Sequence, residues 1–433
     1  MKFMGNNITT NQDGHLTIGG VDTLQIAKEF GTPTIVYDVS KIKEQINAFK
    51  TGFETQGVKY HVSYASKAFS SLAMYKLISE MNIGSDVVSG GELYAALKGG
   101  LNPKEIEFHG NNKSRQELEM AIDNGVGYII IDNFYEIELL GEILDEKQAN
   151  VDVLLRLAPG IHAETHDYIS TGQEKSKFGF DIKSGQADMA LKQVLDNNRF
   201  NLIGIHAHIG SQIFATDGFV QEANKLMDVL NEWQQKYDFS AKVVNLGGGF
   251  GIRYTDDDNP LAIQEFIKII VDALKSKSKE YGYDLPEIWV EPGRSIVGEA
   301  GTTLYTIGSR KDVKGVGSFV AVDGGMGDNI RPALYQAKYD AYLAKDPTAK
   351  PQQNASIVGK YCESGDILIK DYDLPMTKPG DVLAMPSTGA YGYVMASNYN
   401  RNPKPAVVFV EDGKARLVVK RETYDDMLKN EIL

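Results

Sequence analysis

Eight short apolar runs of β type alternate with amphipathic segments of helical period along residues 59–293. The runs span residues 59–67, 84–89, 105–112, 128–133, 151–159, 201–210, 241–249 and 287–293. Alternation of strand and helix predicts a parallel sheet, and eight units favour closure into a (β/α)8 TIM barrel. We therefore expect a barrel domain over residues 36–300, with an open doubly wound sheet as the alternative.

Beyond residue 300 the pattern changes to short β-type runs separated by Gly, Pro, Asp and Ser turns. The clearest runs are SFVAVDG, ASIVGKYC, DVLAMPS, AVVFVEDG and ARLVVKR. The run HLTIGGV precedes the first barrel helix, and its pairing with the later runs would make the second domain discontinuous. We expect a mainly β domain built from residues 1–35 and 301–433.

Composition excludes several classes of protein. The chain has 433 residues and a formal net charge of −13, so it lacks the clustered basic residues that nucleic acids and anionic membranes require. Its single cysteine, Cys362, can form no intramolecular disulfide, and neither a membrane span nor the apolar centre of a signal peptide is visible. Seven scattered histidines match no common metal-binding spacing. We expect a cytoplasmic protein without a metal site.

Chemically capable side chains gather at the ends of the predicted strands, where barrel enzymes place their active sites. They are Lys67, Asp86, His109, Arg156, His208, Gly247, Gly248, Gly249, Glu291 and Arg294. The first run ends on Lys67 among small residues, in YASKAF, and two interpretations are open. Lys67 is either a solvated chain end or a nucleophilic amine at the mouth of the barrel.

Three segments offer contacts for an anion. In NLGGGFG, Gly248 and Gly249 leave their backbone N–H groups free to approach a phosphate, although a tight strand-to-helix turn would explain the same glycines. Ser211 in HIGSQ is a second candidate contact, and Gly293 with Arg294 in EPGRSI is a third.

A phosphate-bearing aldehyde cofactor would give these groups a common purpose, and pyridoxal 5'-phosphate fits them. Lys67 would form the Schiff base, Glu291 would keep the pyridine nitrogen protonated, and His208 would stack on the ring. In the plainer alternative, Glu291 pairs only with Arg294 and His208 is a hydrogen-bonded core histidine.

Nine motifs carry a family resemblance: YASKAF, SDVVSGGEL, FHGNNKS, HAHIGSQ, LGGGFG, EPGRSIVG, IRPALY, CESGD and GAYG. Together and in this order they resemble the diaminopimelate decarboxylases, which are pyridoxal-phosphate enzymes of fold type III related to ornithine and arginine decarboxylases. The resemblance covers roughly residues 30–430. It implies a barrel followed by a β domain, and a head-to-tail homodimer whose active sites are shared across the interface.

The resemblance assigns cofactor contacts position by position. Lys67 matches the Schiff-base lysine, His208 the ring-stacking histidine and Glu291 the partner of the pyridine nitrogen. Asp86 matches the acid that pairs with the lysine once the substrate has displaced it. The implied phosphate contacts are Ser211, Gly248, Gly249, Gly293, Arg294 and Tyr391.

At the substrate end, Arg294, Arg331 and Tyr335 match the residues that grip the distal carboxylate and amine end of diaminopimelate. Tyr391 is a further substrate contact, and Glu363 matches the ligand of the distal ammonium. A guanidinium binds a carboxylate with two parallel hydrogen bonds, so two arginines argue against ornithine, whose far end is a bare amine. A surface or interface salt bridge is the plainer reading of Arg331.

Cys362 in KYCESGD matches the residue that the neighbouring subunit delivers to protonate the substrate carbon after the carboxylate has left. A small buried hydrophobic residue is the usual role of a lone cysteine. Phe69 departs from the pattern, because many relatives carry a small or polar residue there, and this affects the shape of the pocket more than the chemistry.

The resemblance therefore implies decarboxylation of meso-2,6-diaminopimelate at its D-configured centre, which gives L-lysine and CO2 in the last step of lysine biosynthesis. A related decarboxylase acting on arginine, ornithine or carboxynorspermidine is the nearest alternative. Three more distant possibilities are a non-catalytic or regulatory homologue that binds the cofactor, an alanine racemase, and a barrel aldolase that uses Lys67 without a cofactor.

Overall fold

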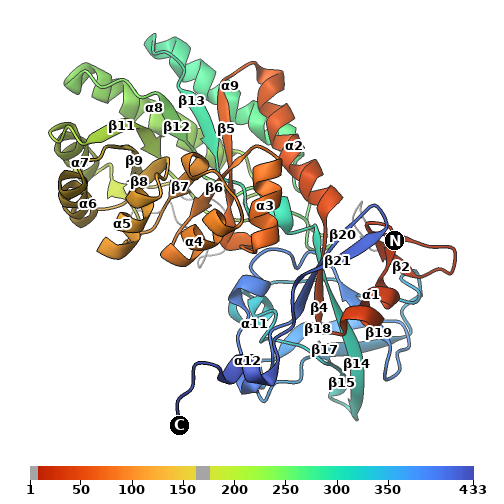
Figure 1. Ribbon diagram of the computed structural model, residues 1–433. Helices are drawn as coiled ribbons and strands as arrows, with labels where there is room; N and C mark the ends of the chain where they lie inside the picture. The colour runs from red at the N-terminus through yellow and green to blue at the C-terminus, as the bar shows by residue number, and fades with distance from the viewer. Residues whose placement is uncertain (1–7, 162–175) are drawn as a thin grey trace. The chain divides into compact units, whose positions relative to one another are not determined.

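The computed structural model describes residues 8–161 and 176–433 of the chain (Figure 1). The chain divides into two compact units. The first consists of Met1–Glu44, Ile252–Asn259 and Ile296–Leu433, and the second consists of Gln45–Gly251 and Pro260–Ser295. Residues 1–7, which belong to the expected β domain, lie outside the described residues.

The second unit contains a closed barrel of eight parallel strands. They are β5 (Tyr60–Ala65), β6 (Gly84–Val87), β7 (Ile106–Phe108), β8 (Tyr128–Ile131), β9 (Val151–Ala158), β11 (Phe200–His206), β12 (Val243–Asn245) and β13 (Glu287–Val290). Strand β13 pairs with β5 and closes the ring, and the short β10 (Phe180–Asp181) pairs with β9 outside it. Every predicted run contains a strand, so the barrel prediction is confirmed and the open-sheet alternative is wrong.

Helices connect the barrel strands and lie outside them (Figure 1). They are α2 (Val39–Gln56), α3 (Leu72–Glu80), α4 (Gly90–Lys98), α5 (Arg115–Asp123), α6 (Phe134–Lys147), α7 (Gln186–Leu195), α8 (Asp217–Tyr237) and α9 (Ile263–Tyr281). A capping box begins α5, because Ser114 and Glu117 exchange hydrogen bonds there. Among the described residues, no helix is both long and apolar enough to cross a membrane.

The period of two along each barrel strand sorts the inward side chains into layers. One layer is an apolar cluster of Ile130, Leu154, Ile203, Val243 and Trp289. Asn245 and Glu291 follow Val243 and Trp289 by two residues, so the same side of the chain becomes polar where β12 and β13 end. The barrel therefore has an apolar floor beneath its polar C-terminal end.

The first unit contains a nine-stranded sheet with the main order β18-β17-β15-β14-β4-β20-β21, while β19 pairs with β14 and β16 pairs with β19. Its strands are β4 (Thr34–Asp38), β14 (Gly301–Val313), β15 (Gly317–Val322), β16 (Tyr342–Leu343), β17 (Gln353–Val358), β18 (Ile367–Leu374), β19 (Val382–Met385), β20 (Ala406–Glu411) and β21 (Lys414–Val419). All five runs predicted beyond residue 300 contain strands, so the mainly β character is confirmed.

The N-terminal run HLTIGGV does not join that sheet. It contributes β2 (Leu16–Ile18) and β3 (Val21–Asp22), which form a separate antiparallel sheet with β1 (Ile8–Thr10). The run still bonds to later segments of its unit, because Leu16 N–H donates to the Ala344 carbonyl at 2.7 Å and Gly413 N–H donates to the Gly19 carbonyl at 2.9 Å. Strand β4 joins instead, antiparallel to β14 and parallel to β20. The small sheet buries its apolar face in the same core as β4 and β20. The remaining helices are α1 (Thr23–Phe30), α10 (Arg294–Val297), α11 (Arg331–Tyr335) and α12 (Tyr424–Leu428).

Candidate active site

Lys67 lies in a 3-10 turn, Ser66–Ala68, that follows β5 directly. Its neighbours in the turn are buried while Lys67 is exposed, so the turn presents the amine at the C-terminal end of a barrel strand. On the adjacent β6, burial raises the pKa of Asp86 to about 8, and the positive charge of Lys67 opposes that rise. The pairing of β5 with β6 thus brings an amine and a buried acid within electrostatic reach.

The EPGR segment packs closely against this end of β5. Ala65 N–H donates to the Pro292 carbonyl at 3.1 Å. A Cβ at Gly293 would lie 2.8 Å from the Ala65 Cβ, which is closer than side-chain carbons approach, so only glycine fits there. The close approach fixes the Glu291 to Arg294 segment beside the Lys67 turn.

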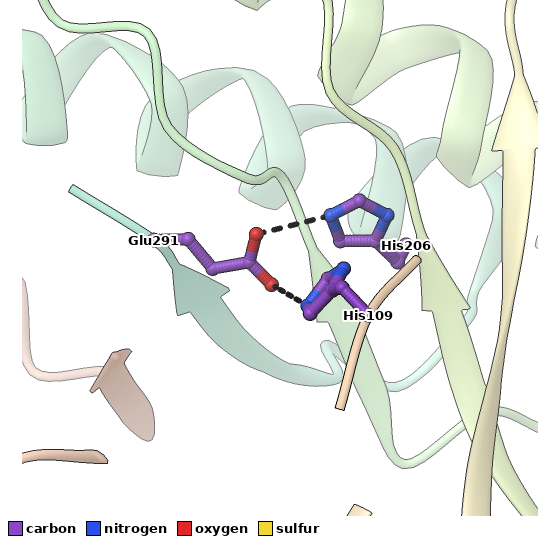
Figure 2. A group of neighbouring side chains, drawn as sticks. All are labelled: His109, His206 and Glu291. Atoms are coloured by element: carbon purple, nitrogen blue, oxygen red, sulfur yellow. Dashed lines mark hydrogen bonds and ion pairs between the residues drawn. The ribbon is translucent and has the colours of Figure 1, made fainter. Parts of the chain in front are cut away.

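Glu291 follows the last residue of β13 and is only 6% exposed. His109 Nε2 lies 2.9 Å from its Oε1, and His206 Nε2 lies 3.2 Å from its Oε2, so each histidine reaches a different oxygen (Figure 2). Glu291 therefore does not pair only with Arg294, and that alternative is wrong. The ligand atoms of these three residues lie within 4.8 Å of one another, a convergence that spacing along the sequence does not reveal.

Electrostatics leave this cluster with one negative charge. Burial alone would raise the pKa of Glu291, but His109 and His206 together hold it well below its usual value. Burial lowers the pKa of His109 to about 4 and also lowers that of His206. Near neutral pH the site is thus an ionised carboxylate between two neutral imidazoles, and it accepts a hydrogen bond from His206.

A second layer of polar groups lies next to Glu291. Asn245, at the end of β12, donates from Nδ2 to Glu291 Oε1 at 2.7 Å and to Glu107 Oε2 at 2.8 Å. Ser63 Oγ donates to the other oxygen of Glu107. All three of these residues, Ser63, Glu107 and Asn245, are fully buried. Burial, and next the charge of Glu291, raise the pKa of Glu107 well above its usual value.

The glycine run after β12 is shaped by close backbone contacts. A Cβ at Gly248 would lie 2.3 Å from the Glu291 carbonyl oxygen, and one at Gly249, whose φ is +113°, would lie 2.6 Å from the Gly210 carbonyl oxygen. The Gly248 N–H donates to His208 Nδ1 at 3.3 Å. Burial, and next the charge of Lys67, lower the pKa of His208 well below its usual value, consistent with a neutral accepting nitrogen. The glycine run is thus a closely packed turn, and it leads into a loop rather than directly into a helix, because α9 begins only at Ile263.

Two predicted anion contacts lie side by side. Arg294 Nε and Nη2 lie 3.2 Å and 3.0 Å from Ser211 Oγ, which accepts from both. The structure therefore brings together the HIGSQ and EPGR segments.

Arg331 begins helix α11 in the β-rich unit and is only 7% exposed. Its Nη1 donates to the hydroxyls of Tyr254 at 2.9 Å and Tyr339 at 2.8 Å. The guanidinium carbon also lies 5.0 Å and 6.0 Å from the centroids of the same two rings, which meet edge to face. We call Tyr254 and Tyr339 the tyrosine clamp. No carboxylate of residues 8–161 or 176–433 forms an ion pair with Arg331.

The other predicted residues of the β-rich unit lie on separate segments. Tyr335 ends α11 and is half-buried. Cys362 and Glu363 are exposed in the turn between β17 and β18, where Cys362 N–H donates to Asn400 Oδ1 at 2.8 Å. Cys362 is thus not the buried hydrophobic residue of the plainer reading. Tyr391 is half-buried in the loop after β19 and has a φ of +59°.

The sequence placed His109 at a strand end without a specific role, and several other residues of both clusters were not predicted. They are His206, Glu107, Asn245, Tyr254 and Tyr339. In the barrel a signal was present, because Glu107, His206 and Asn245 interrupt apolar strands with a polar side chain. The tyrosine clamp gave no such signal, because Tyr254 lies 77 residues from Arg331 in the sequence.

Comparison with known proteins gives a consistent family. Residues 39–298 match the pyridoxal-binding domain of the pyridoxal-dependent decarboxylases. The diaminopimelate decarboxylase of Bacillus subtilis is 58% identical over 427 residues, which cover 99% of this chain and 97% of that protein. The enzyme of the same name from Staphylococcus aureus is 48% identical, with 97% and 98% covered.

Solved structures agree over the whole chain. The M. jannaschii diaminopimelate decarboxylase in complex with L-lysine is 35% identical, with a TM-score of 0.93 and with 99% of this chain and 98% of that chain covered. The Helicobacter pylori enzyme, also complexed with L-lysine, is 32% identical, with a TM-score of 0.85 and coverage of 94% and 98%.

Proposed function

Because this chain belongs to the family of pyridoxal-dependent diaminopimelate decarboxylases, we propose that it removes the carboxylate at the D-configured centre of meso-2,6-diaminopimelate as CO2 and leaves L-lysine. The observation that carries the proposal is the buried, ionised Glu291 held by two neutral histidines. A carboxylate at this position keeps a pyridine ring protonated, which decarboxylation needs. An arginine, as in the racemases of this fold type, would not. The L-lysine bound in two related structures is the expected product.

The residues present suit pyridoxal 5'-phosphate. Glu291 offers its ionised oxygen to the pyridine nitrogen, and Lys67 offers an exposed amine to the aldehyde carbon. We propose that His208 stacks on the ring. The phosphate would be held by backbone N–H groups of Gly248, Gly249 and Gly293, by the Ser211 hydroxyl and Arg294, and by Tyr391. When bound, the cofactor would supply the electron sink for the electron pair left on the substrate carbon as CO2 departs.

Each protein group has a distinct task in this reaction. The Lys67 amine yields its place to the substrate amine, and buried Asp86 then pairs with the released ammonium. Asp86 suits that task because burial raises its pKa and an arriving positive charge lowers it again, so it can give up or take a proton near neutral pH. The exposed Cys362, delivered by the other subunit of a homodimer, would donate the proton that replaces the carboxylate.

Arg331 supports the choice of a substrate with two carboxylates. A guanidinium that is nearly buried and has only hydroxyl acceptors among the described residues favours a ligand that brings an anion. We assign the distal carboxylate to Arg331 with Arg294, and further substrate contacts to Tyr335, Glu363 and Tyr391. The proposal includes a cytoplasmic location, where a single cysteine stays reduced, and a place in lysine biosynthesis.

The decisive experiment measures CO2 release by the holoenzyme from meso-diaminopimelate, L-ornithine, L-arginine and carboxynorspermidine. We expect release from meso-diaminopimelate with L-lysine formed in equal amount. Activity confined to the other amines would overturn the substrate, and absence of activity on all four would favour a non-catalytic homologue. Elemental analysis of the same protein tests the alternative that His109, His206 and Glu291 hold a metal ion.

A further inference from the structure

The carboxylate of Glu291 must be oriented as well as ionised, because one of its oxygens has to face the ring nitrogen. Asn245 Nδ2 donates to Oε1 at 2.7 Å, and His206 Nε2 bonds to Oε2 at 3.2 Å. His109 Nε2 lies 2.9 Å from Oε1 without a hydrogen bond to it. An ionised carboxylate has about four acceptor positions. The two hydrogen bonds, one to each oxygen, therefore fix the rotation of the carboxylate and leave acceptor positions for a further N–H donor.

Asn245 differs from the two histidines in having a donor that does not titrate. Its amide group uses both hydrogens, one toward Glu291 and one toward Glu107. Its Oδ1 accepts from the Gly247 N–H at 2.8 Å. The orientation of the amide follows from these partners, because a flipped amide would place its oxygen against two carboxyl groups and its hydrogens against an N–H.

Gly247 connects this side chain to the glycine run. Its carbonyl accepts from the Glu291 N–H at 2.7 Å, while its own N–H donates to Asn245. A Cβ at Gly247 would lie 2.7 Å from the Ala207 carbonyl oxygen, so the chain is closely packed here. The side chain of Glu291, its backbone and the start of the glycine run therefore form one hydrogen-bonded unit through Asn245.

We propose that Asn245 is a positioning residue: it fixes the rotation of the Glu291 carboxylate and ties it to the glycine run, with Glu107 and Ser63 holding the amide from behind. This role rests on the proposed function, because it matters only if Glu291 meets a ring nitrogen and the glycine run meets a phosphate. Asn245 itself touches neither group in this arrangement.

The test replaces Asn245 with leucine, which has a similar volume and no donors. Apoprotein is titrated with pyridoxal 5'-phosphate, and the holoenzyme is reconstituted with cofactor labelled with 15N in the ring. We expect the cofactor dissociation constant to rise about tenfold or more, because a hydrogen bond to a charged group is lost. We also expect the 15N resonance to move toward the unprotonated position and kcat to fall, with KM for meso-diaminopimelate unchanged.

The matched control is Val243→Ala, which truncates a buried inward-facing residue on the same strand without touching Glu291. It should lower the melting temperature and leave the 15N resonance in place. An equal resonance shift in Val243→Ala, or an unshifted resonance with unchanged affinity in Asn245→Leu, would overturn the role. If the leucine variant does not fold, Asn245→Ser decides in the same way, because serine is too short to reach both carboxyl groups.

Failure of the proposed function is recognised separately. A wild-type enzyme that binds the cofactor with a protonated ring but releases no CO2 from meso-diaminopimelate contradicts the substrate alone, and the resonance comparison still decides the role of Asn245. A wild-type protein that takes up no pyridoxal phosphate overturns both.

Discussion

Two buried charges in this chain have opposite surroundings. The Glu291 anion at the end of β13 is contacted by His109, His206 and Asn245. The Arg331 cation on α11 meets two neutral hydroxyls and two ring faces, and no carboxylate of the described residues pairs with it.

The difference indicates what each charge is for. Removing an ion from water costs several kcal/mol, which donors or a counter-ion must offset. Glu291 is stabilised within its own unit, as suits a group that faces a resident cofactor. Hydroxyls and aromatic faces stabilise the Arg331 cation less than a bidentate carboxylate would. A ligand carboxylate that binds to Arg331 therefore gains more binding free energy than it would at an arginine already paired with an acid. The difference supports the proposal that the Glu291 cluster serves the chemistry and that Arg331 with the tyrosine clamp serves selection of the substrate.

The largest effect is expected from Glu291→Gln, which keeps the shape and removes the negative charge. We expect kcat to fall roughly 10³-fold, because the electrostatic support of the ring nitrogen is lost. The control is Glu222→Gln on α8, since Glu222 is also buried and does not contact the Glu291 carboxylate, and burial raises the pKa of Glu222 well above its usual value. Steady-state kinetics at saturating cofactor measure both, and a Glu291→Gln enzyme within tenfold of wild type would contradict the comparison.

Arg331→Met should have the next largest effect, and it should fall on substrate choice. We expect kcat/KM for meso-diaminopimelate to drop about 10²-fold, because two charge-assisted hydrogen bonds are lost. Any activity on D-lysine, which keeps a D-configured reacting centre and lacks the distal carboxylate, should change far less. Arg310→Met serves as control, because Arg310 is a solvent-accessible arginine of the same unit that pairs with Asp312. Equal losses on both substrates would show that Arg331 does not read the carboxylate.

Much of the fold could be predicted, because the spacing of apolar residues along a short segment indicates whether that segment forms a strand or a helix. Each barrel strand carried an apolar run, and the rule that barrel sites lie at the C-terminal ends of strands pointed to Lys67 and Glu291 before any coordinates. Strand β4 escaped prediction because its partners, β14 and β20, lie more than 260 residues further along the chain. Pairing at such separation leaves no trace in a window of ten residues.

The partners of the two buried charges were harder to predict. In the sequence, Asn245 and His206 are single polar residues in apolar strands, with no visible partner. Their partner becomes evident only because the closed barrel brings β11, β12 and β13 together. The tyrosine clamp joins a loop near residue 254 to a segment near residue 339, and tyrosines are common in both settings. Residue type marks chemical capability, whereas only the topology decides which capable groups meet.

Smaller effects should follow from the hydroxyls of the tyrosine clamp. Tyr254→Phe and Tyr339→Phe each keep a ring face beside Arg331 and remove one acceptor, so we expect KM for meso-diaminopimelate to rise about fivefold with kcat nearly unchanged. Tyr372→Phe is the matched control, because its hydroxyl bonds to Asp340 in the same unit. In a double-mutant cycle, the clamp variants should lose their effect in the Arg331→Met background. Additive effects would mean that the hydroxyls act independently of the guanidinium.

The smallest effect concerns stability and separates the two clusters by pH. Because burial lowers the pKa of His109 to about 4, the unfolded chain binds a proton there between pH 6.5 and about 4 that the folded chain does not. The free energy of unfolding should therefore fall with decreasing pH in this window, by about 2 kcal/mol between pH 6.5 and 5. Urea unfolding of the apoprotein should show a shallower pH slope for His109→Asn than for wild type, and parallel slopes would contradict the neutral imidazole. Arg331 stays charged throughout this range. Its variants should therefore change the free energy of unfolding by the same amount at every pH and leave its dependence on pH unchanged.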